Sequence, residues 1–157
     1  TVTCDQPGIA IRPSGSEYFT VTVNKPGEYT LTINTGTVES QQVFRGKRIP
    51  DPAAYLSDKF GGDIGAGQFR AQAGVMAILR NFDFDARCQT TGFTIWRIQT
   101  DGTRTSVINT GPRFSAEAQE LVNLSLPGDI YIFERIRARC PGDTAGRALH
   151  GMTFFIK

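Results

Sequence analysis

Apolar residues alternate with threonine along two short stretches near the start of the chain, residues 18–23 and 28–33. A period of two places every second side chain on the same face of a β-strand. The residues between them, 24–27, contain a Pro-Gly pair, which is typical of a tight turn. The pattern therefore predicts two strands joined as a hairpin, each with its apolar face against a partner sheet.

The period of two returns later in the chain and predicts further strands over residues 81–88, 93–99, 130–137 and 152–156. Two stretches depart from it. The hydroxyl group of Ser115 is suited to cap a helix, and the apolar residues after it recur at spacings of three and four. Residues 68–79 predict a second short helix that runs into a strand. The chain is therefore expected to be all-β, with one or two short helices.

Prolines at positions 50 and 52 interrupt this pattern, because proline fixes φ and lacks the N–H that a sheet ladder needs. We place a domain boundary here, between residues 1–46 and 47–157. Shortly after it, residues 59–67 are rich in glycine and are expected to form a mobile loop without regular structure.

The composition excludes several classes of protein. The chain has 157 residues, 39% of them hydrophobic, which is enough for one average domain or two small ones. A formal net charge of +2 argues against a nucleic-acid-binding protein. No apolar run approaches the ~18 residues that would span a bilayer. The three cysteines lack the spacing of a zinc site, so neither a metal nor another cofactor is expected.

Few residues are candidates for catalysis. Asp83 and Asp85 share one face of a predicted strand, as a carboxylate pair for acid–base chemistry would, but solvated charges opposite an apolar face are the simpler interpretation. His150 is the only histidine, and no GxSxG motif accompanies it. Asp58 and Asp63 flank the glycine-rich stretch without the ligand pattern of an EF-hand. We therefore assign no catalytic residue and no metal ligand.

Arginines gather near the end of the chain, at Arg135, Arg137, Arg139 and Arg147. Arginine is favoured at protein interfaces, so this cluster suits an acidic partner. A solvated strand face explains it equally well, and the sequence leaves both interpretations open.

Several tracts, in this order and spacing, resemble the C-terminal periplasmic region of the GldM/PorM family of gliding motility and type IX secretion. They are residues 43–52 (VFRGKRIPDP), 81–85 (NFDFD), 127–131 (PGDIY), 133–143 (FERIRARCPGD), then Arg147 and a final apolar strand over 152–157. Residues before Phe44 resemble the end of an immunoglobulin-like domain that precedes this region in the family.

The resemblance implies an all-β fold of two consecutive β-sandwich, immunoglobulin-like modules, the first incomplete. It implies a non-catalytic structural and interaction module of the periplasm, anchored to the inner membrane through an N-terminal helix upstream of this fragment. The module would form a homodimer and transmit force from the inner-membrane protein GldL (PorL), through upstream regions, to ring proteins of the GldK/GldN (PorK/PorN) type. Neither nucleic acid nor direct membrane contact of this fragment is expected.

The resemblance implies a periplasmic location, and the periplasm is oxidising, so a disulfide between two of the cysteines is expected. Cys88 lies on the apolar face of a predicted strand and Cys140 ends another. We expect these two residues to form a disulfide. Cys4 is then left unpaired, or paired with a residue upstream of the chain.

By the same resemblance the C-terminal module meets the outer-membrane-associated ring, and loops on a rigid sandwich are the usual place for recognition. Lys59, Asp63, Asp143 and Arg147 lie in the two least regular segments and are the expected partner-binding residues, provided that both segments share one end of the sandwich. The alternative is that Asp143 and Arg147 only hold their own loop together.

A rival function is that of a carbohydrate-binding or hydrolytic extracytoplasmic β-sandwich. Sugar-binding sites use exposed aromatic rings, and Trp96 with Tyr55 would supply such a platform if both side chains were exposed. The residues around Trp96 fit a buried strand face equally well.

Overall fold

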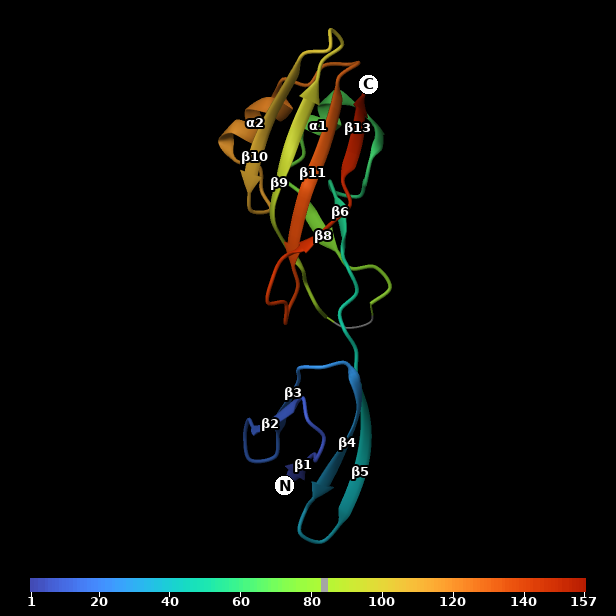
Figure 1. The fold of residues 1–157 in the computed structure, drawn as a ribbon, viewed down its shortest axis with the longest axis vertical. Helices are drawn as coiled ribbons and strands as arrows, with labels where there is room; N and C mark the ends of the chain where they lie inside the picture. The colour runs from blue at the N-terminus through green and yellow to red at the C-terminus, as the bar shows by residue number, and fades with distance from the viewer. Residues whose placement is uncertain (83–84) are drawn as a thin grey trace. The chain divides into compact units, whose positions relative to one another are not determined.

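The computed structural model describes residues 1–82 and 85–157, which form two compact units, Thr1–Arg48 and Ile49–Lys157. The division lies two residues after the boundary expected from the prolines. Strands dominate both units (Figure 1), so the all-β, sandwich-like fold with short helices in the second unit is confirmed.

Unit 1 contains a three-stranded sheet and a separate hairpin among its described strands. The sheet has the order β1-β4-β5 and the hairpin joins β2 to β3. The bounds are β1 Val2–Thr3, β2 Ile9–Pro13, β3 Phe19–Val23, β4 Gly27–Asn34 and β5 Glu39–Gly46. Tyr29 and Leu31 of β4 are buried, whereas every residue of β3 is exposed.

The hairpin expected between residues 18–23 and 28–33 is wrong, although both stretches are strands. β3 pairs with β2, and β4 pairs with β5. The turn after β4 explains the second pairing: Gly36 has a φ of 93° and donates its N–H to Asn34 Oδ1 at 2.8 Å, which returns the chain onto β4. Alternation indicates which face of a strand is apolar, but it does not determine the neighbouring strand.

Unit 2 is built on a sheet of six described strands in the order β10-β9-β11-β13-β7, with β12 beside β11. Neighbouring strands are antiparallel except β7 and β13, which are parallel. The bounds are β7 Gly62–Ile64, β9 Gln89–Ile98, β10 Arg104–Thr110, β11 Ile130–Arg139, β12 Arg147–Ala148 and β13 Met152–Ile156. The strands expected over 93–99, 130–137 and 152–156 are thus confirmed.

One face of this sheet is covered by a second layer (Figure 1). The layer consists of α1 (Ala66–Arg70), α2 (Ala116–Asn123) and the two-stranded sheet of β6 (Ala53–Tyr55) and β8 (Met76–Ile78). Phe69 of α1 packs on Phe133 and Phe154 of the sheet, with ring centroids 6.4 and 6.1 Å apart. All three rings are fully buried, so they lie at the centre of the core.

The helix after Ser115 is confirmed as α2. Ser115 Oγ accepts a hydrogen bond from Ala118 N–H at 3.2 Å, and Ala118, Leu121 and Val122 are buried. At the other end, the hydroxyl group of Tyr131 donates to the Leu121 carbonyl at 2.6 Å, which satisfies one of the carbonyls that a helix end leaves free.

Two other expectations are wrong. The glycine-rich stretch 59–67 is not an irregular loop, because it contains β7, whose parallel pairing with β13 gives its backbone hydrogen-bond partners. Among the described residues of 81–88, none belongs to a strand, and β9 begins only at Gln89. Asp83 and Phe84 lie outside the described residues.

Candidate functional site

Arg147 is the centre of the most extensive polar network in the described residues. Its guanidinium group donates to both carboxylate oxygens of Asp143, at 2.8 and 2.7 Å. It also donates to the carbonyls of Ile49 and Pro50, at 2.8 and 3.0 Å, and to Asp51 Oδ1 at 3.0 Å. The hydrogen bond with Asp143 raises the pKa of Arg147 above its usual value. Arginine is suited to this position because its planar group carries several fixed donors.

The network fastens the start of unit 2 to the loop that follows β11. Arg147 begins β12, which pairs with the last residues of β11, and its side chain is only 10% exposed. Asp143 also accepts the Cys140 N–H at 2.9 Å. We call Arg147, Asp143 and the backbone of residues 49–51 the entry clamp, because they hold the chain where it enters unit 2.

A disulfide reinforces the same end of the sheet. It joins Cys88 and Cys140, the two residues that the sequence singled out, across a separation of 52 residues. Cys88 directly precedes β9 and Cys140 directly follows β11, and these two strands are neighbours. Cys4 is a free cysteine of intermediate exposure.

The structure does not bring all four expected partner-binding residues together. Asp143 and Arg147 are paired in the entry clamp, as the alternative interpretation expected. Asp63 pairs instead with Lys157 at 3.6 Å. On the sheet, Asp63 lies opposite Phe155 of β13, and Phe155 lies opposite Ile130 at the start of β11. Asp143 follows the opposite end of β11, nine residues along the strand, or roughly 30 Å at the usual rise per residue. Lys59 lies in the turn after β6, where its N–H donates to the Leu56 carbonyl at 2.9 Å.

Of the other three arginines in the C-terminal cluster, Arg137 and Arg139 border the loop after β11. Arg137 donates to the Gly146 carbonyl at 3.4 Å, and Arg139 donates to the Thr144 carbonyl at 3.5 Å. Arg135 lies 4.0 Å from Glu134 and is exposed. All three arginines therefore present charge to solvent, two of them beside the entry clamp.

Trp96 and Tyr55 do not form an aromatic platform. Tyr55 is 4% exposed, with the guanidinium group of Arg80 4.7 Å above its ring. Trp96 is partly buried on the sheet, where its Nε1–H donates to Glu134 Oε1 at 2.8 Å. The feature that would have favoured sugar binding is absent from this pair.

The other candidate groups are isolated. Asp83 of the predicted carboxylate pair lies outside the described residues, and Asp85 lies 3.9 Å from Arg87, both highly exposed. His150 and Asp58 are exposed. Within residues 1–82 and 85–157, no group of three or more His, Cys, Asp and Glu side chains is arranged to hold a metal ion. Among these residues, no helix has the length and apolar character needed to cross a bilayer.

The outer face of the unit 2 sheet carries a group of apolar side chains, which the sequence reasoning missed. Ile108 is 79% exposed and Phe155 43% exposed, and they flank half-buried side chains at Trp96, Ile98, Ile130 and Ile132. These residues alternate with the core-facing ones along their strands. The signal was present in the sequence: the first four residues of β11 are all apolar, and Trp96 and Ile98 of β9 lie on the face opposite Ile95, so these stretches lack the polar alternation of a solvated sheet.

Residues 50–157 match the protein family described as the GldM C-terminal domain, which covers nearly all of unit 2. Comparison with curated proteins gives no match.

Proposed function

The chain belongs to the family of GldM C-terminal domains, a component of gliding motility and type IX secretion, and on this premise we propose that it is a non-catalytic module that transmits force. It would carry force from an inner-membrane motor to ring proteins associated with the outer membrane. We further propose that it does so in the periplasm, as part of a protein anchored to the inner membrane.

The entry clamp is the observation that carries this proposal. A pull on the chain before Ile49 reaches the Arg147 side chain within three residues, through the Ile49 and Pro50 carbonyls and Asp51. From Arg147 it passes into β12 and β11, and the disulfide at Cys88 and Cys140 joins β11 to β9. The load is therefore shared by the central strands β11 and β9, and it does not fall on a single edge strand of the sheet. A module that only bound a ligand would not need this reinforcement at its point of entry.

The proposed partners are ring proteins of the GldK/GldN type, with GldL reached through upstream regions. Because Asp143 and Arg147 are engaged in the clamp, we place the charges that meet the ring on Arg137 and Arg139 instead. Both are exposed and border the loop after β11. Lys59 and Asp63 remain a second, separate candidate surface.

Binding of a purified GldN-type protein, measured by biolayer interferometry at low and moderate salt, tests the proposal. We expect saturable binding that is weakened by the double reversal Arg137→Glu/Arg139→Glu and unchanged by Arg104→Glu on β10. Loss of binding with Lys59→Glu/Asp63→Lys alone would move the contact to the other surface. No binding by the unaltered chain would refute the ring as its partner.

We also propose that the module acts as a homodimer. The apolar side chains on the outer sheet face support this, because exposed apolar surface can mark an interface. Substitution Ile108→Asp should then shift the mass measured by light scattering toward the monomer. A chain that is monomeric at all concentrations would contradict the proposal.

A further inference from the structure

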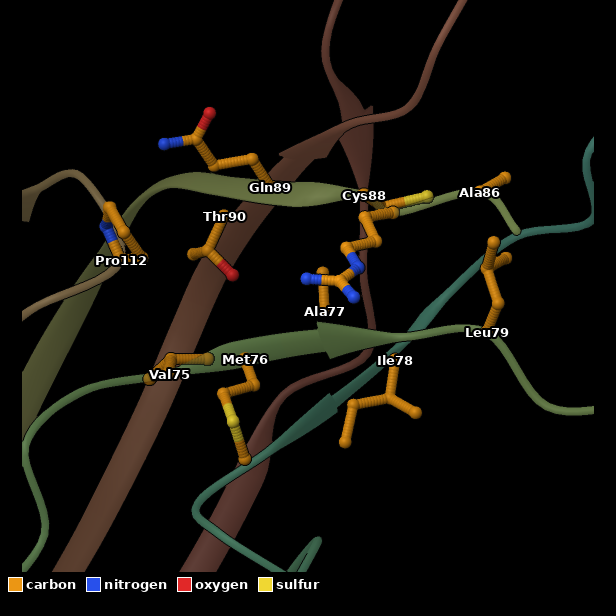
Figure 2. Close-up of a pocket in the computed structure, with 11 residues that line it drawn as sticks. Val75, Met76, Ala77, Ile78, Leu79, Ala86, Cys88, Gln89, Thr90 and Pro112 are labelled. Carbon is orange, nitrogen blue, oxygen red and sulfur yellow. The ribbon is translucent and has the colours of Figure 1, made fainter.

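A pocket lies between β8 and the start of β9 (Figure 2). Its volume is about 410 Å³, and it is lined by residues 75–79, residues 86–90 and Pro112, none of which belongs to β6. This is within the range of about 300–1,000 Å³ that is usual for ligand pockets. Most of the lining side chains are apolar, and the polar ones are Arg87, Gln89 and Thr90. We call it the β8 pocket.

The backbone of β8 has an open edge on the side of this pocket. Before β8, the Val75 N–H donates to the Pro112 carbonyl at 2.8 Å. Peptide groups two residues apart in a strand point to the same side, so those of Ala77 point the same way as those of Val75. β6 pairs with the other side, and the described strands provide no further neighbour for β8. The N–H and carbonyl of Ala77 therefore lie on the same side of β8 as the Val75 N–H, where another strand could pair with them.

Thr90 provides a second, independent indication of a ligand. The residue is 2% exposed and lines the pocket, yet its Oγ1 has no hydrogen-bond partner among the described residues. Figure 2 shows its side chain projecting from β9 toward the strand that carries Met76. Buried hydroxyl groups are normally paired, because an unpaired one loses its hydration without compensation. A ligand in the pocket would supply the missing partner.

The charge at the pocket indicates the character of that ligand. Arg87 is the ionisable residue of the lining, and its side chain is 90% exposed and lies 3.9 Å from Asp85. Arg113, next in sequence to the lining residue Pro112, is also exposed. The margin is therefore basic and suits an acidic side chain.

We propose that the β8 pocket binds an extended, acidic segment of a partner protein, which adds to β8 as a further strand. Main-chain hydrogen bonds to Ala77 would set the register, an apolar side chain would fill the pocket, a polar group would reach Thr90 and a carboxylate would meet Arg87. This inference deepens the proposed function and rests on it, since it supplies a docking mode for a partner.

The test uses the whole chain and a phage-displayed library of random short peptides. Peptides are selected on the unaltered chain and counter-selected on Ala77→Pro, which removes the open-edge donor while leaving the bonds to β6. We expect selected peptides to alternate apolar residues and to contain Asp or Glu. Their affinity, measured by fluorescence anisotropy, should fall about tenfold with Ala77→Pro.

Thr90→Val keeps the inference falsifiable if Ala77→Pro does not fold. This isosteric change removes only an unpaired hydroxyl, so the chain should be no less stable, while peptide affinity should fall about fivefold. Ser125→Ala is the matched control, because Ser125 Oγ is also buried and unpaired but lies outside the pocket. Arg87→Glu should weaken binding and reduce its salt dependence, whereas Arg104→Glu should not.

Failure to enrich any peptide against the counter-selection, or equal affinity for the unaltered chain and Thr90→Val, overturns the inference. Self-association that Ala77→Pro abolishes, without peptide binding, would overturn it in favour of a second copy of this chain. Binding to the GldN-type protein is measured separately. If it persists undiminished in Thr90→Val, the pocket proposal fails and the proposed function stands.

Discussion

At the scale of single residues, the interior of unit 2 contains an ion pair between Arg97 and Asp129. Arg97 Nε and Nη2 both lie 2.8 Å from Asp129 Oδ2, and the two side chains are 8% and 3% exposed. The same carboxylate oxygen accepts the Leu126 N–H at 3.0 Å. Its position is therefore fixed by both the arginine and the turn that precedes β11.

Replacing one partner of this pair should be severe. Arg97→Met leaves the Asp129 carboxylate buried without its cation, and we expect the free energy of unfolding to fall by about 3–5 kcal/mol. Urea denaturation followed by circular dichroism measures it. The double variant Arg97→Met/Asp129→Asn should recover part of the loss, because Asn still accepts the Leu126 N–H. A single variant as stable as the unaltered chain would show that the pair is not desolvated.

Arg147 allows a more conservative test. Arg147→Lys keeps the charge, but an ammonium group cannot engage both Asp143 oxygens and the carbonyls of residues 49 and 50 together. We expect a loss of about 1.5–3 kcal/mol in thermal or urea unfolding, the value of hydrogen bonds to a buried charge. Arg45→Lys, in an exposed pair with Glu28 at 3.7 Å, is the control and should change stability by less than about 0.5 kcal/mol.

At the scale of elements, the disulfide restricts how far β9 and β11 can separate when unit 2 unfolds. It closes a loop of 52 residues, for which the chain-entropy account gives about 4 kcal/mol. Cys88→Ser/Cys140→Ser should lower the free energy of unfolding by that amount, and Cys4→Ser should leave it unchanged. Alkylation of the unaltered chain without reductant should label one thiol. Three labelled thiols would contradict the pairing.

The elements that the sequence predicted correctly are those whose stabilising contacts are encoded locally. α2 has its capping serine and apolar face within one segment, and β11 and β13 show alternating apolar residues within one short stretch each. β7 was missed because a parallel edge strand receives its hydrogen bonds from β13, about ninety residues later in the chain. Pairing at such a distance leaves no periodic signal in a glycine-rich stretch.

The candidate site was predictable only in part for the same reason. The pair Asp143 and Arg147 is separated by four residues and could be suspected from the sequence. Their link to residues 49–51 spans almost a hundred residues and could not. Lys59 and Asp63 were grouped with them because irregular segments often share one end of a sandwich, but β7 holds Asp63 beside β13 at the far end of β11.

At the scale of the whole molecule, the two units differ in how they bury apolar residues. The large hydrophobic cluster is drawn from residues 54–156, with Phe69, Tyr131, Phe133 and Phe154 completely buried, whereas the described residues of unit 1 bury only Tyr29 and Leu31 among their apolar side chains. In unit 1 the large apolar residues of β3, together with Val43 and Phe44 of β5, are exposed. Sheets with uncovered apolar faces usually require a covering partner. Stability of the described residues therefore resides mainly in unit 2.

This difference predicts the effect of truncation. A fragment of residues 49–157 keeps the core, the disulfide and the entry clamp, so its free energy of unfolding, followed by Trp96 fluorescence, should lie within about 1 kcal/mol of that of the full chain. A fragment of residues 52–157 lacks the Ile49 and Pro50 carbonyls and Asp51, and should lose about 1.5–3 kcal/mol more. Equal stability of the two fragments would mean that the clamp does not hold the chain at its entry, and the load path drawn through Arg147 would have to be abandoned.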